Sequence, residues 1–409
     1  MNVLLTFGLL LILAHISGLL LQNTGLPKII GYIATGVLLS PNSFDIIDAS
    51  FTQATQPIME ICLAFIAFEV GGELKWEKIQ SYKKDIISIA LMESFAAYIL
   101  TVTGIFSLNA LFPQLISLDP LHFTVFAFLL GALACPTAPA ATLAVMHQYK
   151  AKGKVTNTIL GVVALDDVLG ILLFSITLSL IPIFVGGLEG LPANHHITDA
   201  VYKILVAILI GILLGYTIRF IAKFMKPSSE GIWVIIIFSL IIFCVGISEF
   251  LQIDKLLAYM TMGVVIVNTC DQHKIIFGIL NRYTEELIFL IFFVLSGLHM
   301  DIMVFPQVAP IIVVFVIFRS IGKFAGVYTG ASITGADKEI RKYTFGGLIP
   351  QAGIVIGLVL SIYQREGFME IADILLTTIM GATIINELIG PVLTKYTLMK
   401  AKEIKSGKH

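Results

Sequence analysis

The chain has 409 residues, of which 57% are hydrophobic and 13% are charged, and its mean hydropathy is +0.95. Soluble domains carry about one quarter charged residues, so this composition indicates an integral protein of a lipid bilayer. The net charge of −1 offers no basic surface for binding nucleic acid. The four cysteines are far apart and lack C-x-x-C spacing, which argues against a disulfide framework or a cysteine metal site.

Thirteen helical segments can be drawn along the chain, and most are long enough to cross a bilayer. They span residues 2–21, 28–39, 53–72, 85–110, 121–148, 155–185, 198–222, 231–250, 255–269, 275–298, 306–332, 340–363 and 370–398. The first segment lacks a basic start and a small-residue cleavage site, so we expect a retained helix rather than a signal peptide. A short polar tail, 400–409, follows the last segment.

Basic residues fall mainly in alternate connections between these segments. Cytoplasmic loops of membrane proteins are enriched in Lys and Arg. The pattern therefore predicts a multi-pass protein with its N-terminus outside and its C-terminus in the cytoplasm.

Two of the segments carry helix breakers at mid-depth. The fifth contains Pro136 and Pro139, and the twelfth contains Pro350, Gln351 and Gly353. Proline removes an amide donor and clashes with the preceding turn, and an irregular backbone is tolerated in a membrane only where protein or a cavity surrounds it. Paired broken helices in the two halves of a chain are typical of a transporter binding site.

Adjacent carboxylates, Asp166 and Asp167, lie in the middle of the apolar run from Val155 to Val185. An ionised Asp at the bilayer centre costs about 2.5–3.5 kcal/mol, so intramembrane carboxylates usually serve a function. Neighbours on a helix point about 100° apart. One carboxylate is therefore expected to meet an ion and the other a partner within the protein.

Arg319 and Lys323 are four residues apart on one face of the eleventh segment. Both are candidate charge partners of the intramembrane carboxylates. We expect Lys323 to pair with an aspartate and to lose that partner when an ion arrives, because the pKa of a buried lysine shifts readily. Alternatively, both side chains extend to the inner surface of the membrane.

Glu69, at the inner end of the third segment, is expected either to line a cavity or to form a structural pair. The other acidic and histidine residues of the spans are expected to make ordinary structural contacts: Glu93, Glu249, Glu387, His15 and His299. No phosphate-binding G-x-x-x-x-G-K-[ST] motif is present. We therefore expect a transporter without cofactors, driven by an ion gradient rather than by ATP, and not an enzyme.

With these residues considered, the sequence resembles the monovalent cation:proton antiporter superfamily, in particular its Kef/Nap-like bacterial branch. The resemblance rests on five blocks in order along the chain, together with the position of the Asp pair. The blocks are Gly25-Leu-Pro27 to Gly36 with Ser40-Pro41, Phe65 to Leu74, Phe292 to Asp301, Gly347 to Gln351, and Glu387-Leu-Ile-Gly-Pro391.

The resemblance implies an NhaA-like inverted-repeat antiporter fold with two crossing broken helices, in a homodimer of the bacterial inner membrane. It implies a core domain (85–185 and 306–398), a scaffold domain (1–72 and 231–298) and a linker helix (198–222), with elevator-type alternating access. It places Na⁺ or K⁺, in competition with a proton, on Asp167, with Thr137 beside it. Asp166 falls on the preceding variable position, and Lys323 on the basic partner of that position.

The sequence departs from the family pattern at the crossing, which reads Thr137-Ala138-Pro139, and at Gln351-Ala-Gly353, where many Kef-like members have Gln-Gly-Glu. Many Kef-type members also have Gln where this chain has Asp166, and they carry a C-terminal nucleotide-binding regulatory domain that is not expected here. These differences favour a stand-alone antiporter over a ligand-gated potassium efflux system and leave Na⁺ or K⁺ open. The alternatives are a Kef-type channel-like subunit and an ion-coupled solute symporter on a related fold. An intramembrane aspartyl protease is disfavoured because its two aspartates must come from different helices.

Overall fold

The structure is a computed structural model that describes residues 3–23, 28–41, 43, 46–77, 84–113, 115, 118–185, 197–225, 229–251, 253, 255–299, 305–362 and 368–404. The motif residues Gly25, Pro27 and Asp301 and the tail from 405 onward lie outside these ranges. The chain divides into two compact units, each formed by two stretches of sequence. Unit 1 comprises Met1–Ile79 and Pro192–Met303, and unit 2 comprises Gln80–Leu191 and Val304–His409.

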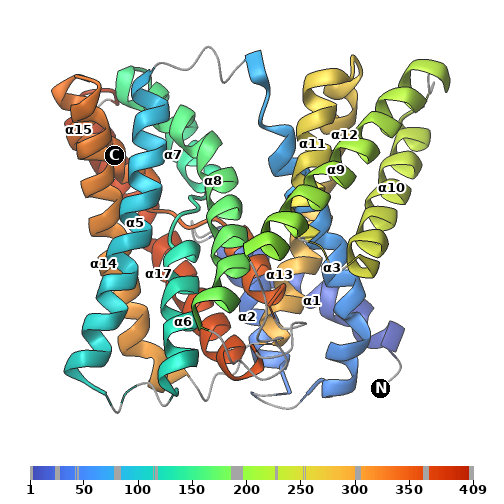
Figure 1. The fold of residues 1–409 in the computed structure, drawn as a ribbon, viewed down its shortest axis with the longest axis horizontal. Coiled ribbons are helices and arrows are strands. Elements are labelled where there is room, and N and C mark those ends of the chain that lie inside the picture. The colour runs from blue at the N-terminus through green and yellow to red at the C-terminus, as the bar shows by residue number, and fades with distance from the viewer. Residues whose placement is uncertain are drawn as a thin grey trace. The chain divides into compact units, whose positions relative to one another are not determined.

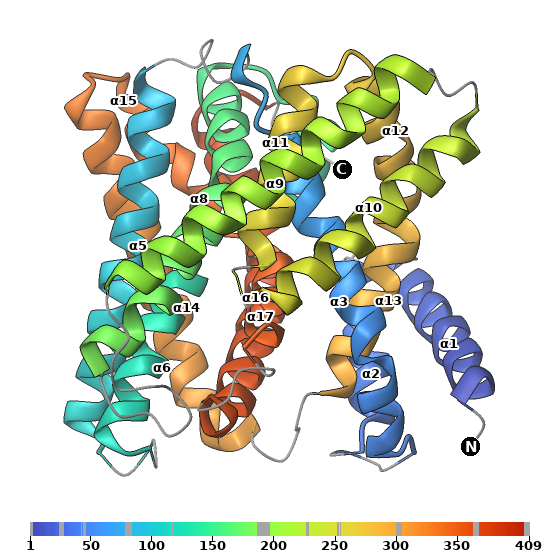
Figure 2. The ribbon, with the colours of Figure 1, turned by 45° about the vertical axis from the view of Figure 1, so that its right-hand side comes forward.

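Unit 1 is built from helices that pack through small residues. Its elements are α1 (Val3–Asn23), α2 (Lys28–Leu39), α3 (Ala49–Gly72), α9 (Ile197–Met225), α10 (Glu230–Phe250), α11 (Lys255–Thr269), α12 (His273–Tyr283), the π-helical η1 (Thr284–Ile288) and α13 (Phe289–Leu298). Helix α11 packs against both α9 and α3 (Figures 1 and 2). A Cβ on Gly71 would overlap the backbone of Met260, and one on Gly263 the backbone of Phe68, so these glycines allow close helix contact.

Unit 2 contains the interrupted helices. Its elements are α5 (Lys84–Leu111), α6 (Pro120–Leu133), α7 (Pro139–Gln148), α8 (Lys154–Val185), α14 (Phe305–Ile333), α15 (Lys338–Tyr343), the 3₁₀ helix η2 (Thr344–Leu348), α16 (Ile354–Leu360) and α17 (Met369–Lys400). Helices α5 and α14 lie side by side (Figures 1 and 2). Gly322, Gly326 and Gly330 bring α14 against the backbone of α5, because a Cβ at any of them would overlap that backbone.

The expectation of an all-helical, multi-pass membrane protein is confirmed. Eight helices of the described residues are long and apolar enough to cross a membrane, and four shorter apolar helices accompany them. Thirteen spans are therefore not established. The predicted segment 121–148 divides into α6 and α7, the segment 340–363 divides into α15, η2 and α16, and the segment 275–298 contains the π-helical turn η1.

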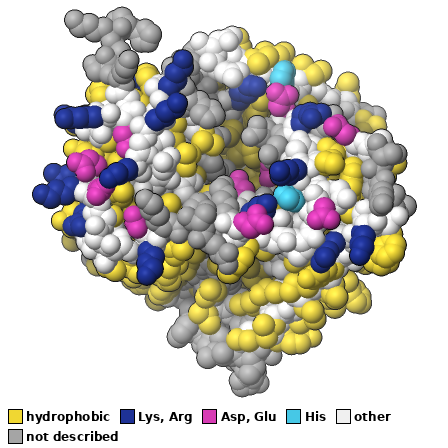
Figure 3. Space-filling model, turned by 90° about the horizontal axis from the view of Figure 1, so that it is seen from above, with side chains coloured by type: hydrophobic (Ala, Val, Ile, Leu, Met, Phe, Trp, Pro, Cys, Tyr) yellow, Lys and Arg dark blue, Asp and Glu magenta, His cyan; other side chains and the backbone are white. Residues whose placement is uncertain are grey.

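Charged side chains of the described residues gather on the face of the molecule drawn in Figure 3, with hydrophobic side chains around them. Many large apolar side chains elsewhere are exposed, for example Leu4 at 81% and Phe250 at 86%. Such exposure is the rule for a surface that faces lipid rather than water.

Candidate ion-binding site

The two broken helices of unit 2 meet at their interruptions. Helix α6 ends at Leu133 and α7 begins at Pro139, while η2 ends at Leu348 and α16 begins at Ile354. Between them, Thr137 and Gln351 form an isolated antiparallel bridge, and the Ala138 amide donates to the Pro350 carbonyl at 3.0 Å. The prolines leave backbone groups without helical partners, and the crossing pairs some of them with each other. The side chain of Pro139 lies outside the described residues.

Arg319 holds this crossing together from α14. Its guanidinium is fully buried and donates to two carbonyls of the first interruption, Ala134 at 3.0 Å and Pro136 at 2.9 Å. It also donates to two carbonyls of the second, Ile349 at 2.6 Å and Pro350 at 3.5 Å. The alternative of a side chain that extends to the membrane surface is wrong for Arg319. Its contacts in the described chain go to backbone carbonyls, so it acts as a clamp rather than as the expected partner of a carboxylate.

Lys323, one turn further along α14, lies in a fully buried cluster of oxygen atoms. Its Nζ is 2.6 Å from Glu93 Oε2 and 3.3 Å from Asp166 Oδ2. The same ammonium donates to the Cys135 carbonyl at 2.5 Å and to Thr137 Oγ1 at 2.9 Å. One buried cation therefore faces two buried carboxylates. The alternative of a side chain that extends to the membrane surface is wrong for Lys323 as well.

Asp166 connects the lysine to the crossing. Its Oδ2 accepts a hydrogen bond from Thr137 Oγ1 at 2.5 Å as well as the contact from Lys323. Its Oδ1 is buried and has no hydrogen-bond partner among the described residues. Buried polar atoms are nearly always hydrogen-bonded, so this oxygen is suited to a ligand that supplies positive charge.

Asp167 follows Asp166 on α8 and is 9% exposed, whereas Asp166 is fully buried. The one-residue step turns its side chain about 100° around the helix from that of Asp166. The structure thus gives the two carboxylates different surroundings. Glu69 is half-buried in α3 of unit 1, and its suggested place in a cavity stays a prediction.

Sequence reasoning assigned Glu93 to ordinary structural contacts and missed its place beside Lys323. Glu93 lies on α5 opposite Gly326 of α14, where the two backbones touch. Its Oε1 also accepts from the Ser94 hydroxyl at 3.1 Å. An ionisable residue in the middle of an apolar span is a signal of function, and that signal was present in the segment 85–110.

Asn386, on α17, is a second residue that sequence reasoning did not consider. Its amide Nδ2 donates to Gln351 Oε1 at 2.8 Å, and Gln351 Nε2 donates to the Leu133 carbonyl at 3.3 Å. Both side chains are buried. Gln351 therefore ties the second interruption to the end of α6, and Asn386 ties α17 to Gln351. Gly353 precedes α16 with an ordinary negative φ of −63°.

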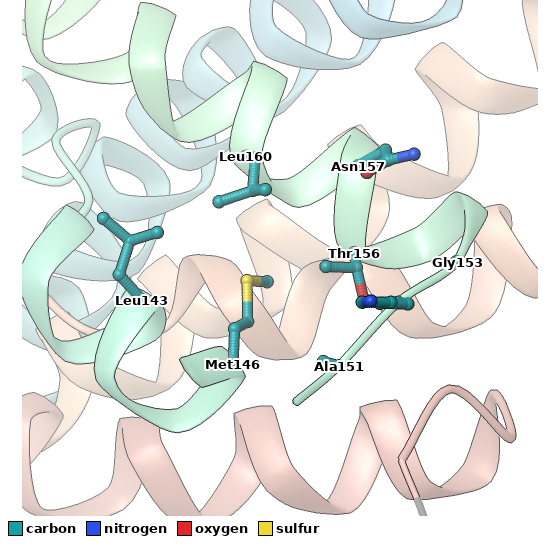
Figure 4. Close-up of a pocket in the computed structure, with 8 residues that line it drawn as sticks. Leu143, Met146, Ala151, Gly153, Thr156, Asn157 and Leu160 are labelled. Carbon is teal, nitrogen blue, oxygen red and sulfur yellow. The ribbon is translucent and has the colours of Figure 1, made fainter. Parts of the chain in front are cut away.

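A cavity of about 400 Å³ lies elsewhere in unit 2, at the start of α8. Leu143 and Met146 of α7 approach it from one side and Thr156 and Leu160 of α8 from the other (Figure 4). Neither aspartate lines it. This cavity is therefore separate from the crossing.

Comparison with known proteins agrees with this architecture. The family model described as "Sodium/hydrogen exchanger, transmembrane" matches residues 9–400. A Na(+)/H(+) antiporter of Enterococcus hirae is 22% identical over 402 residues, covering 96% of this chain and 97% of that protein.

Two solved structures of the sodium proton antiporter MjNhaP1 from Methanocaldococcus jannaschii share the fold, each with 16% sequence identity. The structure at pH 8 has a TM-score of 0.76 and covers 97% of this chain and 98% of that chain. The electron-microscopy structure has a TM-score of 0.69 and covers 98% of both. The predicted antiporter fold and the resemblance to the cation:proton antiporter superfamily are confirmed. Because the family model matches almost the whole sequence, the chain belongs to the sodium/hydrogen exchanger family.

Proposed function

We propose that the protein is a secondary active antiporter that exchanges a monovalent cation, Na⁺ before K⁺, for protons. The observation that carries this proposal is the buried cluster at the crossing, in which Thr137, Asp166 and Lys323 contact one another beside Asp167. The membership of the sodium/hydrogen exchanger family supports it.

Asp167 is the residue that binds either the cation or a proton. Its 9% exposure leaves it more accessible than Asp166. A low-dielectric environment disfavours a bare carboxylate, so the site is stable when a cation or a proton neutralises it and costly when empty. Competition for one carboxylate, together with this penalty on the empty form, yields exchange rather than leak.

Asp166 assists through its two oxygens. Oδ2 is held by Thr137 and Lys323, while the buried Oδ1 has no partner in the described part of the chain. Oδ1 is the atom that turns to the arriving cation. Thr137 fixes the carboxylate to the unwound crossing, so that motion of the crossing and binding of the ion are linked.

Glu93 determines how many protons are exchanged for each cation. The family resemblance suggests that Lys323 loses its proton when the cation draws Asp166 away. Glu93 Oε2 is closer to the ammonium than Asp166 Oδ2 is, at 2.6 Å against 3.3 Å. Lys323 therefore keeps Glu93 as a close partner when Asp166 turns away, and we expect one proton to be exchanged for each cation.

Unit 2 carries the site, and we assign it the moving role in an elevator-type cycle, with unit 1 as the scaffold through which two copies form a homodimer. The assignment follows the family resemblance and the concentration of buried charge in unit 2. The N-terminus is assigned to the outside and the C-terminus to the cytoplasm from the distribution of basic residues.

The test is exchange by purified protein in liposomes, with outward gradients of Na⁺, K⁺ or Li⁺ and a pH-sensitive dye inside. Sodium is expected to drive the fastest proton flux, and Asp167→Asn is expected to abolish it. With the membrane potential clamped, Asp166→Asn should leave the charge moved per cycle unchanged. A loss of voltage dependence in that variant would instead support a second proton from the Asp166–Lys323 pair.

A further inference from the structure

A second segment of unit 2 repeats the pattern of the aspartate pair. Asp166-Asp167-Val-Leu-Gly170 on α8 and Asn386-Glu387-Leu-Ile-Gly390 on α17 have the same order: a short acid or amide, an acid, two apolar residues and a glycine. Each segment lies on the long helix that follows a broken helix, α7 in one half and α16 in the other. The two segments therefore occupy corresponding places in the two halves of the unit.

The packing of the two segments is also the same. A Cβ on Gly170 would overlap the ring of Pro136, and a Cβ on Gly390 would overlap the ring of Pro350. Each glycine thus lets its long helix lie directly against the proline of one interruption. The correspondence is one of three-dimensional contacts as well as of sequence.

Hydrogen bonds at the crossing follow the same rule. The first residue of each pair bonds the residue that comes directly after the proline: Asp166 accepts from Thr137 at 2.5 Å, and Asn386 donates to Gln351 at 2.8 Å. Thr137 and Gln351 are the two residues that form the antiparallel bridge. Glu387 therefore occupies the position in the second half of unit 2 that Asp167 occupies in the first half.

The surroundings of Glu387 contain buried oxygen atoms with no assigned partner. Glu387 is 5% exposed, Asn386 is fully buried and Thr383 is 1% exposed. Asn386 Oδ1 and Thr383 Oγ1 have no hydrogen-bond partner among the described residues. Thr383 lies three positions before Asn386 and four before Glu387, so its hydroxyl lies on α17 between the side chains of these two neighbours. Carboxylate, amide and hydroxyl oxygens are the ligands that hard cations prefer.

Each segment also has one basic residue of α14 near the crossing. Lys323 contacts Asp166, and Arg319 donates to the Ile349 and Pro350 carbonyls of the second interruption. The guanidinium is held by the carbonyl ends of both broken helices, which carry partial negative charge. Arg319 attracts the Glu387 carboxylate electrostatically, but its hydrogen bonds go to these carbonyls, so the Glu387 oxygens stay open to a proton or a cation.

From these observations we infer that Glu387, with Asn386 Oδ1 and Thr383 Oγ1, forms a second site for a monovalent cation, in which a proton competes for the carboxylate. The inference rests on the proposed function, because it assigns to the second half the ligand that Asp167 binds in the first. The second site holds one carboxylate against two in the first, so it binds the cation more weakly.

The test is the amount of radioactive Na⁺ bound by the purified full-length protein in equilibrium dialysis at alkaline pH. We expect about two ions per chain for the wild type, about one for Asp167→Asn and about one for Glu387→Gln, with none for the double variant. Sodium-dependent thermal stabilisation gives a second readout, since a ligand of the folded state raises the unfolding temperature. It should persist in each single variant and vanish in the double one.

A variant that gains Na⁺ affinity distinguishes an effect on the site from an effect on folding, because a misfolded protein would not bind more tightly. Asn386→Asp, in the Asp167→Asn background, supplies the second carboxylate found in the first pair and should tighten Na⁺ binding about tenfold. Glu249→Gln, on the exposed end of α10, is the control and should leave binding unchanged.

Absence of bound Na⁺ in Asp167→Asn, with one ion in the wild type, would overturn the second site and leave the proposed exchange intact. Persistence of sodium-driven proton flux in Asp167→Asn would instead overturn the proposed exchange site. Two results together would also contradict the inference: Asp167→Asn binds no Na⁺, and Glu387→Gln takes up as many protons on titration as the wild type. They would show that the Glu387 carboxyl binds neither Na⁺ nor a proton.

Discussion

The two units bury polar groups of different kinds. In the described part of unit 1 the buried polar residues carry hydroxyl groups, such as Thr35, Thr55 and Ser296. These bond carbonyls of their own helix, as Thr55 does with Phe51 at 2.9 Å and Ser296 with Phe292 at 2.6 Å. Thr35 also contacts the Ser17 hydroxyl of α1 at 2.6 Å, and Ser40 donates to the Leu298 carbonyl at 2.8 Å, so the partners of these groups are neutral hydroxyls and carbonyls.

Unit 2 buries the described residues that carry a formal charge: Glu93, Asp166, Asp167, Arg319, Lys323 and Glu387. Lys323 of α14 pairs with Glu93 of α5 and Asp166 of α8. Each such charge is costly to bury unless it is paired. The difference indicates that unit 1 is built for stable packing in lipid and unit 2 for binding ions.

Removal of Lys323 should have the largest effect on stability. Lys323→Ala leaves Glu93 and Asp166 buried without their cation, so we expect the free energy of unfolding to fall by about 3–5 kcal/mol and exchange to be lost. The measurement is unfolding in detergent followed by circular dichroism.

The matched control is the ion pair of unit 1 between Lys255 and Glu60, whose side chains are 25% and 18% exposed at a distance of 3.1 Å. Lys255→Ala should cost only about 0.2–1 kcal/mol, because water screens a partly exposed pair. Equal losses in the two variants would show that the buried cluster is no more important to the fold than a peripheral pair.

The next effect concerns the glycines of α14. A Cβ on Gly326 would overlap the backbone of α5 at Glu93, so Gly326→Ala should force the helices apart. Overpacking of this kind costs about 1–3 kcal/mol, and it should also slow exchange because Lys323 shifts from Glu93. Gly246→Ala on α10, where a Cβ meets nothing within 4 Å, is the control and should be neutral or slightly stabilising. Unfolding temperature and liposome exchange, measured together, check both variants.

A subtler effect is expected from Glu93→Gln. Lys323 then has only Asp166 as a charged partner, so it should release its proton when the cation engages Asp166. Exchange should persist but become more dependent on membrane potential, because an additional charge moves in each cycle. Proton flux in liposomes at potentials set by a potassium ionophore measures this. Unchanged voltage dependence would show that Glu93 does not retain the lysine proton.

The smallest effect is expected in unit 1. Thr55→Val removes a hydroxyl that bonds within its own helix, to Phe51 at 2.9 Å and Thr52 at 3.2 Å. We expect a loss of about 0.5–1.5 kcal/mol and an unchanged exchange rate. A tenfold slower exchange at equal protein content would contradict the contrast between the units.

Much of this architecture follows from the sequence. Hydrophobic runs mark the helices, and Pro136 and Pro350 mark the two interruptions because proline leaves few backbone alternatives. The carboxylates of Asp166 and Asp167 stand out because charge inside an apolar span is rare. These are local signals, and each can be read from a few neighbouring residues.

The contacts of the site could not be read in this way. Lys323 and Glu93 are separated by 230 positions in the chain, and only the packing of α5 on α14 brings them together. Arg319 was expected to meet a carboxylate, but its geometry directs it to carbonyls that exist only where two broken helices cross.

The central claim is that Asp167 carries the exchanged ion. Its most direct test is sodium-driven proton flux in liposomes that contain either the wild-type protein or Asp167→Asn at equal density. We expect a flux in the wild type that reverses with the sodium gradient, and no sodium-dependent flux in the variant. A variant that retains the flux while Asp166→Asn loses it would contradict the account and assign the ion to the other carboxylate.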